Sequence, residues 1–405
     1  MRLWRKKRDI VLLSTTNQAL RTQNRQMNFE LNETQKMIRE TARQFAHDEL
    51  ASTAESRDEK EEFPHDAVKK LGELGFMGMV VPEQYGGAGL DTVSYSLAVE
   101  EISRVDASCG VIMSVNNSLV CYGINEYGTE DQKQKFLNPL ATGKKLGAFA
   151  LSEPEAGSDA TNQRTMAVRD GDFYVLNGIK NWITNGLNAD YVLVIAATDP
   201  AKGAHGISAF IVEKGMAGFT AGKKERKLGI RSSDTVSLAF QDVRVPLGNR
   251  IGEEGSGFKF AMKTLDGGRI GIASQAVGIA QASLDAAVKY AKERKAFDQP
   301  IAHLQAIQFK LADMATEIDA ARLLTLQAAA MKDSGKRFTQ HAAMAKLFAS
   351  KIAVKCALEA IQIHGGYGYI REYNVERYLR DAKITEIYEG TSEIQRIVIA
   401  RSLLQ

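Results

Sequence analysis

The chain has 405 residues, of which 44% are hydrophobic and 25% charged, which is ordinary for a soluble globular protein of two or three domains. The formal net charge is +3, but residues 1–26 hold seven basic residues and one acidic residue, so the remainder carries a net charge of −3. A slightly acidic body has no electrostatic reason to bind nucleic acid, and the sequence has no run of about 18 apolar residues that would predict a membrane span.

Residues 1–26 can be interpreted in two ways. Their basic, acid-poor composition suits an organellar transit peptide, which would direct the protein to the mitochondrial matrix. We favour an unstructured extension ahead of a folded protein that begins near Met27, and a bacterial cytoplasmic location. Three widely spaced cysteines argue for a reducing compartment rather than a disulfide framework, and the histidines lack metal-ligand spacing, so no metal is expected.

Residues 27–144 predict an α-helical domain. Asn32 with Gln35, and Thr129 with Gln132, fit the capping-box pattern that opens a helix. A helix that carries Val68, Leu71 and Leu74 is expected to stop at Gly75, and a further helix is expected to begin near Thr92.

Residues 145–255 predict a β domain. Short β-branched and aromatic runs (FYVLNG, YVLVIAAT, GISAFIVEK and TVSLAFQDVRVP) alternate with turn residues. This pattern indicates an antiparallel sheet or barrel.

Residues 256–405 return to the helical period, with long segments near 258–292, 302–333, 338–363 and 375–388 that suit a helical bundle. The order of helices, sheet and helices excludes an alternating βαβ chain and indicates an α+β fold. Near the end, Glu389 precedes a break at Gly390, and Ser392 with Gln395 fits another capping box.

Several common catalytic motifs are missing from the sequence. No GxGxxG follows a strand, and GEEGSGF at 252–258 continues with Lys259 in a pattern that does not fit a phosphate loop. No GxSxG nucleophile elbow occurs. The remaining candidates are glycine-rich and polar clusters, each of which has a plain structural explanation when taken alone.

Together, these clusters resemble the acyl-CoA dehydrogenase family over residues 28–404. The resemblance rests on LSEPEAGSD, WITNG, DGGRIGIASQAVGIAQ, QIHGGYGY and RDAKITEIYEGTSEIQR in this order, and VIMSVNNSL is most similar to the short-chain members. It implies a helical N-terminal domain, a central antiparallel β-barrel and a C-terminal four-helix bundle. It also implies a homotetramer with one FAD per subunit.

The implied reaction is the first step of fatty-acid β-oxidation on short straight-chain, butyryl-type acyl-CoA. In the family, the glutamate of the YEG corner removes the α proton while a hydride passes from the β carbon to the flavin, and electron-transferring flavoprotein accepts the electrons. The resemblance assigns the catalytic base to Glu389. The physical logic agrees, because a carboxylate buried beside an apolar acyl chain has a raised pKa and is a better base. Gly268 occupies the position where some relatives place the base, and glycine cannot act as one.

The resemblance also assigns binding residues. Contacts to the subunit's own flavin are expected from Phe149, Leu151, Ser152, Ser158, Trp182, Ile183, Thr184, Thr391 and Glu393. Contacts to the FAD of a neighbouring subunit are expected from Arg294, Gln305, Gln362, Gly365 and Gly366. Substrate contacts are expected from Ser158, Asp266, Arg269 and Gly390, and the Glu389 N–H is expected to stabilise the thioester oxygen.

One departure from the family pattern leaves alternatives open. Asp298 stands where relatives usually have glycine, so the geometry of that turn is in question. Besides a straight-chain enzyme, we consider a short branched-chain dehydrogenase, an oxidase-like enzyme that passes electrons to oxygen, and a non-catalytic flavin or acyl-CoA scaffold.

Overall fold

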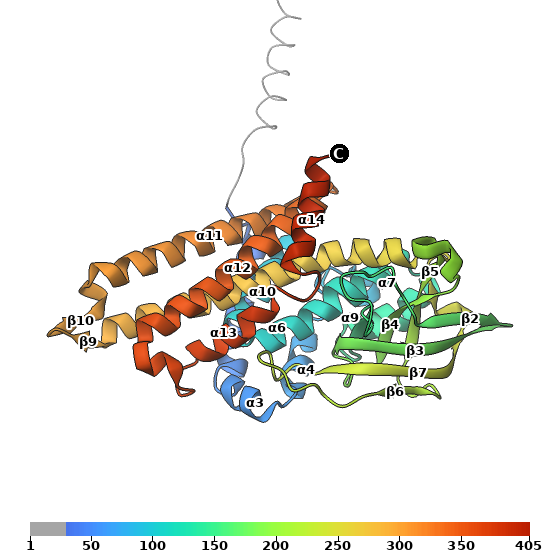
Figure 1. The fold of residues 1–405 in the computed structure, drawn as a ribbon, viewed down its shortest axis with the longest axis horizontal. Coiled ribbons are helices and arrows are strands. Elements are labelled where there is room, and N and C mark those ends of the chain that lie inside the picture. Colours follow the sequence, from blue (N-terminus) through green and yellow to red (C-terminus); the bar gives the residue numbers. More distant parts are fainter. Residues whose placement is uncertain (1–29) are drawn as a thin grey trace, which may run out of the picture. The chain divides into compact units, whose positions relative to one another are not determined.

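The structure is a computed structural model that describes residues 30–405 (Figure 1). The basic leader predicted at 1–26 lies outside the described residues. The described residues fall into two units, 30–37 and 38–405. In the first, the predicted capping box is confirmed, because Asn32 N donates to Gln35 Oε1 (3.0 Å) and Gln35 N donates to Asn32 Oδ1 (2.9 Å). This box opens α2 (Glu33–Phe45).

The second unit begins with a run of helices. They are η1 (Ala46–Leu50), α3 (Ala54–Lys60), α4 (His65–Glu73), η2 (Glu83–Tyr85), α5 (Thr92–Val105), α6 (Ala107–Ser114), η3 (Val115–Cys121), α7 (Tyr122–Tyr127), α8 (Glu130–Gln132), η4 (Lys133–Leu137) and α9 (Asn138–Ala141). The predicted stop at Gly75 and the predicted capping box of Thr129 and Gln132 are both confirmed.

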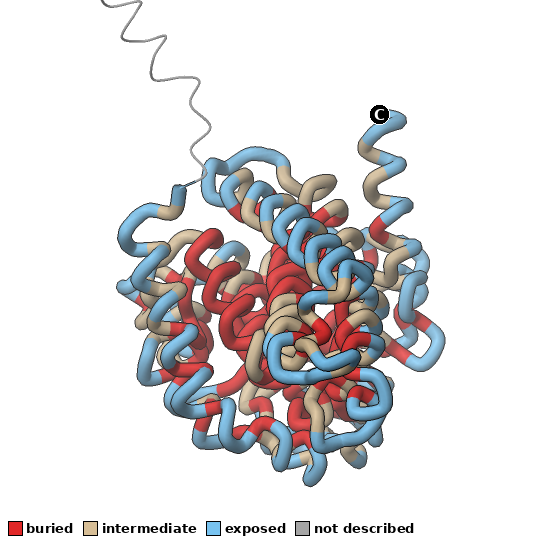
Figure 2. Tube along the Cα trace, turned by 90° about the vertical axis from the view of Figure 1, so that its left-hand side faces the viewer, coloured by how far each residue is buried: buried red, intermediate tan, exposed pale blue. Residues whose placement is uncertain are grey.

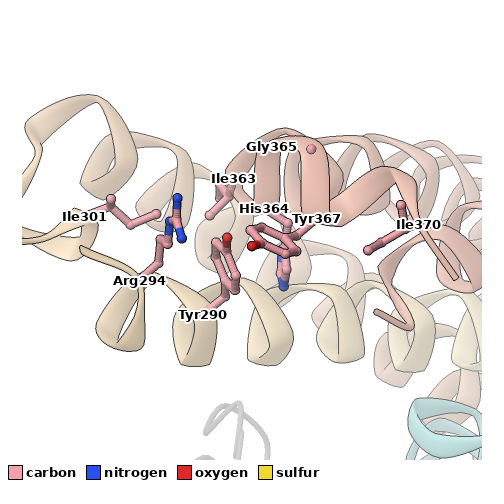
Figure 3. Close-up of a pocket in the computed structure, with 9 residues that line it drawn as sticks. Tyr290, Arg294, Ile301, Ile363, His364, Gly365, Tyr367 and Ile370 are labelled. Atoms are coloured by element: carbon pink, nitrogen blue, oxygen red, sulfur yellow. The ribbon is translucent and has the colours of Figure 1, made fainter. Parts of the chain in front are cut away.

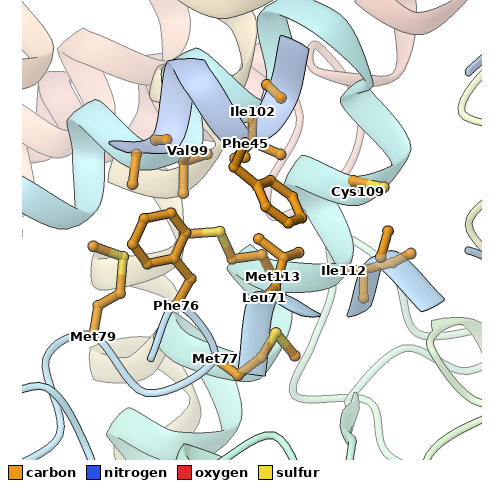
Figure 4. Packing of buried hydrophobic residues seen from close by; sticks show 14 of the residues in the cluster. Phe45, Leu71, Phe76, Met77, Met79, Val99, Ile102, Cys109, Ile112 and Met113 are labelled. Atoms are coloured by element: carbon orange, nitrogen blue, oxygen red, sulfur yellow. The ribbon is translucent and has the colours of Figure 1, made fainter. Parts of the chain in front are cut away.

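One apolar core joins these helices. Figure 4 shows Phe45, Leu71, Phe76 and Met113 converging from separate elements, and each of these side chains is buried. Burying a side chain of this size contributes about 1.5–3 kcal/mol. The segment Ala107–Tyr127 is long and apolar enough to cross a membrane by composition, but 94% of its most apolar window is buried inside the protein, as in a core helix.

The predicted strands form one eight-stranded sheet. Its strands are β1 (Gly147–Ala150), β2 (Met166–Asp170), β3 (Phe173–Thr184), β4 (Tyr191–Ala197), β5 (Ile207–Glu213), β6 (Phe219–Ala221), β7 (Thr235–Pro246) and β8 (Arg250–Ile251). The order is β6-β7-β3-β2-β4-β5-β8, with β1 beside β4. Most pairings are antiparallel as expected, but β1 pairs parallel to β4, and a single parallel bridge joins β2 to β4.

Long helices complete the fold. They are α10 (Gly257–Glu293), α11 (Gln305–Asp333), α12 (Thr339–His364), α13 (Val375–Ile384) and α14 (Ser392–Leu403). The 37-residue α10 is about 55 Å long and packs against α5, α11 and α12 (Figure 1). The residues of α10 from Ile270 to Ala280 are buried, whereas α14 ends at the exposed Leu403. Figure 2 shows the buried interior and the exposed helix that leads to the C-terminus.

A β-hairpin with a two-residue turn follows α10, and Asp298 lies in that turn. Strand β9 (Lys295–Ala296) pairs antiparallel with β10 (Gln299–Pro300), and Phe297 and Asp298 form the turn with φ of 51° and 61°. Two consecutive left-handed residues make the turn type that favours glycine at its second position. Asp298 therefore keeps the turn geometry, at a cost in backbone strain.

Replacing Asp298 with glycine is expected to stabilise the protein by roughly 0.5–1 kcal/mol, because glycine adopts the left-handed conformation without a Cβ clash. The midpoint of urea unfolding, at an unchanged slope, measures the effect. Asp298→Ala is the matched control and should lower the midpoint. An unchanged midpoint in both variants would show that the turn carries no strain.

Candidate active site

Glu389 lies in the turn between α13 and α14. Glu389 and Gly390 are both left-handed, with φ of 52° and 95°. The capping box predicted for Ser392 is wrong, because Thr391 is the N-cap and its Oγ1 accepts from Ile394 N. Ser392 is the first helical residue instead. A non-glycine residue held at positive φ costs about 1–3 kcal/mol, and such strain concentrates at functional sites.

The turn at Glu389 and Gly390, here called the corner, is held in place by hydrogen bonds to one carbonyl oxygen. Lys346 Nζ and Gln395 Nε2 both donate to Gly390 O, at 2.6 and 2.8 Å. Lys346 lies on α12 and is fully buried. Sequence reasoning missed Lys346, because α12 also carries two other lysines and the sequence does not mark one lysine as buried. Two donors from separate elements restrict the movement of the strained corner.

The Glu389 carboxyl group is poised as a base. Its Oε2 atom is buried and has no hydrogen-bond partner within the described chain. Burial raises the pKa of Glu389 to about 7, and the positive charges of Lys346 and Arg269 limit the rise. Burial likewise lowers the pKa of Lys346 to about 8. A carboxyl group with a pKa near neutrality can accept a proton under ordinary conditions.

Gly268 of α10 faces this carboxyl group. A Cβ at position 268 would overlap Glu389 Oε2 and would lie 2.8 Å from Leu119 Cδ2. The absence of a side chain at 268 therefore gives the Glu389 carboxyl group its space.

Replacing Gly268 with alanine is expected to lower kcat by up to about 10²-fold, because the new methyl group pushes the carboxyl group aside and about 1 Å of misplacement is costly. Steady-state turnover measures this. Gly267→Ala is the matched control, since its Cβ would meet Lys332 Nζ at an ordinary 3.4 Å. Equal losses in both variants would contradict the displacement of Glu389.

The two predicted substrate contacts on α10 lie beside the corner and pair with each other. Arg269 Nη1 donates to Asp266 Oδ1 at 2.5 Å, and Thr339 Oγ1 donates to Asp266 Oδ2 at 2.6 Å. Arg269 Nε is buried and lacks a partner among residues 30–405. This leaves one oriented donor near the carboxyl group of Glu389.

Most of the predicted contacts to the subunit's own flavin lie at or after the ends of β1 and β3, whereas Thr391 and Glu393 lie at the start of α14. Asn181 N donates to Ser152 O at 2.9 Å, which ties the segment after β1 to a bulge in β3. Trp182 in this bulge has φ of 63°, and 65% of its surface is exposed. Phe149, Leu151 and Ile183 are buried behind it, Thr184 is partly buried and Ser158 is exposed. An exposed indole beside polar chain ends is suited to stacking on a planar ligand.

Behind these segments lies a buried lysine that the sequence did not single out. Lys180 Nζ donates to Glu153 Oε1 at 2.7 Å and to Leu151 O at 3.1 Å, and it also donates to Gln163. The Lys180 and Glu153 side chains are 0% and 3% exposed. Glu153 in turn accepts from the backbone N–H groups of Arg164 and Thr165. The pair fastens the segment after β1 onto β3.

Helix η3 links the flavin side to the corner. A Cβ at Gly147, the first residue of β1, would lie 2.7 Å from Val120 of η3. A Cβ at Gly268 would lie 2.8 Å from Leu119, the residue before Val120. Consecutive residues of η3 therefore contact β1 and the Gly268 face of α10. The structure brings the predicted base and substrate contacts together, and η3 packs between them and the strand that leads to the predicted flavin contacts.

The remaining predicted contacts lie elsewhere. Arg294, Gly365 and Gly366 line a pocket of about 470 Å³ at the far end of α10 (Figure 3). Its aromatic wall includes Tyr290, which stacks on His364 with ring centroids 4.2 Å apart. Gln305 and Gln362 are exposed. Because 26 residues separate Gly268 from Arg294, the two places are about 39 Å apart along the helix. One dinucleotide does not reach from one to the other.

Comparisons with known proteins agree with this arrangement. Three family models match: "Acyl-CoA dehydrogenase, N-terminal domain" over residues 32–144, "middle domain" over 148–243 and "C-terminal domain" over 255–404. The mitochondrial short-chain specific acyl-CoA dehydrogenase of Rattus norvegicus is 57% identical over 376 residues, covering 93% of this chain and 91% of the relative.

Two solved structures are similar over nearly the whole chain. Butyryl-CoA dehydrogenase from Megasphaera elsdenii has a TM-score of 0.92 at 51% identity, covering 94% of this chain and 100% of that one. A chain in a structure described as the electron transferring flavoprotein of Acidaminococcus fermentans has a TM-score of 0.93 at 54% identity, with the same coverage.

Proposed function

The chain belongs to the acyl-CoA dehydrogenase family, and we propose on this premise that it oxidises short straight-chain acyl-CoA thioesters of the butyryl type to trans-2-enoyl-CoA. The observation that carries the proposal is the Glu389 carboxyl group, whose buried Oε2 has no partner among the described residues and whose pKa is raised to about 7, opposite Gly268. We place the reaction at the first step of fatty-acid β-oxidation. The proposed location is the cytoplasm, and the mitochondrial alternative depends on residues 1–26.

In the proposed mechanism, Glu389 removes the α proton of the thioester through its free Oε2 atom. The Glu389 N–H stabilises negative charge on the thioester oxygen, as an oxyanion-hole donor does. Asp266 and Arg269 orient the substrate arm, with Arg269 Nε as the spare donor, and Ser158 and Gly390 add contacts. Leu119 and the apolar core behind it keep water away from the carboxyl group, which maintains its basicity.

The residues present fit FAD. The exposed Trp182 offers a flat apolar face, and Ile183 and Thr184 follow it at the end of β3. The backbone of Phe149, Leu151 and Ser152 would hold the polar ring edge, and Thr391 and Glu393 at the start of α14 would hold polar groups of the cofactor. When bound, FAD supplies the acceptor for the hydride that leaves the β carbon.

The far pocket supports a homotetramer in which each FAD is shared between subunits. Arg294 offers a planar fork for a phosphate, and Gly365 and Gly366 allow close backbone approach. With Gln305 and Gln362, these residues would hold the FAD of a neighbouring subunit. For electron transfer we propose electron-transferring flavoprotein as the partner, which the similar chain from Acidaminococcus fermentans supports.

Anaerobic mixing with butyryl-CoA tests the proposal. Rapid bleaching of the flavin absorbance is expected, with crotonyl-CoA as the product. Protein that binds no FAD would favour the scaffold alternative. Faster turnover on isobutyryl-CoA would favour the branched-chain alternative, and rapid peroxide formation without a protein acceptor would favour the oxidase alternative.

The pH dependence should report on Glu389. The carboxylate is the active form, so with a pKa of about 7 the rate is expected to fall about tenfold per pH unit below pH 7 and to level off above it. The pH profile of kcat/KM measures this. In Lys346→Met, the loss of a positive charge should raise the Glu389 pKa and move the acid limb to higher pH. If the acid limb of the kcat/KM profile stays at the wild-type pH, the charge of Lys346 does not lower the pKa of Glu389.

A further inference from the structure

Side chains from other helices cover α10 one turn beyond Gly268, the glycine that faces Glu389. Gly268 opposes the Glu389 carboxyl group, and Gly271 lies one turn further along the same face. A Cβ at Gly271 would lie 2.5 Å from the hydroxyl oxygen of Tyr95 and would overlap Ser114 Oγ. The Tyr95 and Ser114 hydroxyl groups therefore occupy the space above Gly271.

Beyond Gly271, helix α5 packs directly against α10. Ser96 Oγ and Ser274 Oγ are 2.7 Å apart. At Gly278 the helices are so close that a Cβ would lie 3.0 Å from Arg104 N. Tyr95 is the α5 residue in this contact that lies nearest the Glu389 corner. An occupant of the space over Gly268 consequently meets Tyr95 before any other part of α5.

Tyr95 is fixed rather than free to swing away. It is 2% exposed, and its hydroxyl oxygen lies 2.9 Å from Ser114 Oγ. Burial raises its pKa, the hydroxyl groups of Ser114 and Ser118 oppose this rise, and the Glu389 charge adds to it. The ring is therefore neutral, held by a hydroxyl contact, and close enough to Glu389 to sense its charge.

A second tyrosine reaches α10 from the Glu389 corner. Tyr388, which precedes Glu389, donates its hydroxyl hydrogen to Gln275 Oε1, and Gln275 Nε2 donates to Ala107 O at 2.8 Å. Tyr388 thus spans from the corner to the next turn of α10. Two anchored phenol rings enclose the face beyond Gly268.

The direction of the acyl chain follows from the two ends of this face. Asp266 and Arg269 lie at the end toward Thr339 and the loop after α11, whose residues 335–337 are exposed. The opposite end, from Ile270 to Ala280, is wholly buried. The bulky CoA arm requires the open end, so the tail of the acyl group points toward Gly271. Gly268 and Gly271 are about 4.5 Å apart along the axis of α10, which corresponds to the length of a few methylene groups.

We propose that Tyr95 sets the maximum acyl chain length, by closing the acyl site one helical turn beyond the Glu389 carboxyl group and limiting substrates to butyryl size. The inference rests on the proposed function and adds a residue that determines specificity. Tyr95 does not touch the reacting atoms, so its effect is on which substrates fit.

Tyr95→Ala is the direct test. Removing the ring opens the space above Gly271, so the ratio of kcat/KM for octanoyl-CoA to that for butyryl-CoA is expected to rise at least about tenfold, in line with the value of a few buried methylene groups. Tyr95→Phe keeps the ring and should leave the ratio near the wild-type value. If Tyr95→Ala does not fold, Tyr95→Leu carries the same test, because it also lacks the outer ring atoms.

A control and a binding measurement separate specificity from general loosening. Ile102→Ala makes a cavity on the same helix, in the core of Figure 4 and two turns from Tyr95, and should leave the ratio unchanged. Dissociation constants of S-butyl-CoA and S-octyl-CoA thioethers should show the same shift without turnover. An unchanged ratio in a folded, flavin-containing Tyr95→Ala or Tyr95→Leu overturns the inference. Wild-type protein that is inactive on every acyl-CoA would instead overturn the proposed function.

Discussion

Replacing Glu389 with glutamine is expected to lower kcat on butyryl-CoA by about 10²–10⁴-fold, the usual contribution of a positioned general base. Glutamine has nearly the same shape, and Oε2 makes no hydrogen bond among the described residues that the substitution would break, so the fold and the bound flavin should be retained. An amide cannot accept the α proton, so only the chemical step is lost. Single-turnover reduction of the flavin measures that step directly.

Glu386→Gln is the matched control for this experiment. Glu386 lies three residues earlier, and its carboxylate pairs with Lys383 at 2.6 Å near the surface. Its replacement should leave flavin reduction close to the wild-type rate. If Glu389→Gln keeps more than about a tenth of the wild-type rate, another group must take the proton and the proposed role of Glu389 is wrong.

Local sequence pattern predicted the elements of the fold well, because caps and periodicity act within a few residues. The pairs Asn32–Gln35 and Thr129–Gln132 close their boxes as expected. At the corner, however, the capping box predicted for Ser392 with Gln395 was wrong. The left-handed turn at Glu389 and Gly390 decides for Thr391.

The sequence pattern did not predict the pairing of strands that are far apart in the chain. Strand β1 is an apolar stretch of four residues that lies parallel to β4, and its partner is more than forty residues away. Nothing in GAFA indicates that direction. The buried amide of Asn116 fixes this strand, because Asn116 Oδ1 accepts from Gly147 N at 2.9 Å. Such a contact follows from the packed structure and not from local propensity.

In the candidate site, too, local motifs were predicted from the sequence and long-range contacts were not. The family motif indicated Glu389, Asp266 and Arg269, whereas Lys346 and Tyr95 were not singled out. Lys346 on α12 donates to the Gly390 carbonyl oxygen, and Tyr95 on α5 lies close enough to Glu389 to sense its charge. In the sequence, Lys346 is one of three lysines of α12, and Tyr95 is an ordinary core aromatic. Only the folded structure shows that both lie near Glu389.

Lys180→Met is expected to destabilise the protein by about 3–5 kcal/mol, because it leaves the buried Glu153 carboxylate without its counter-charge. Burial lowers the pKa of Lys180 to about 8 despite the opposing effect of Glu153, which shows how completely the pair is removed from water. Since Lys180 also donates to Leu151 O, the segment predicted to hold the flavin should loosen. Chemical unfolding of the apoprotein and the flavin content after gel filtration measure the two effects.

A double variant separates these effects. In Lys180→Met combined with Glu153→Gln, no buried charge remains and the backbone N–H groups of Arg164 and Thr165 keep an acceptor, so much of the stability should return. The flavin should still be bound weakly, because Leu151 O has lost its donor. Lys202→Met, which breaks an exposed pair with Asp199, should change neither quantity appreciably. If flavin binding recovers in step with stability, Lys180 supports only the fold and does not position the flavin segment.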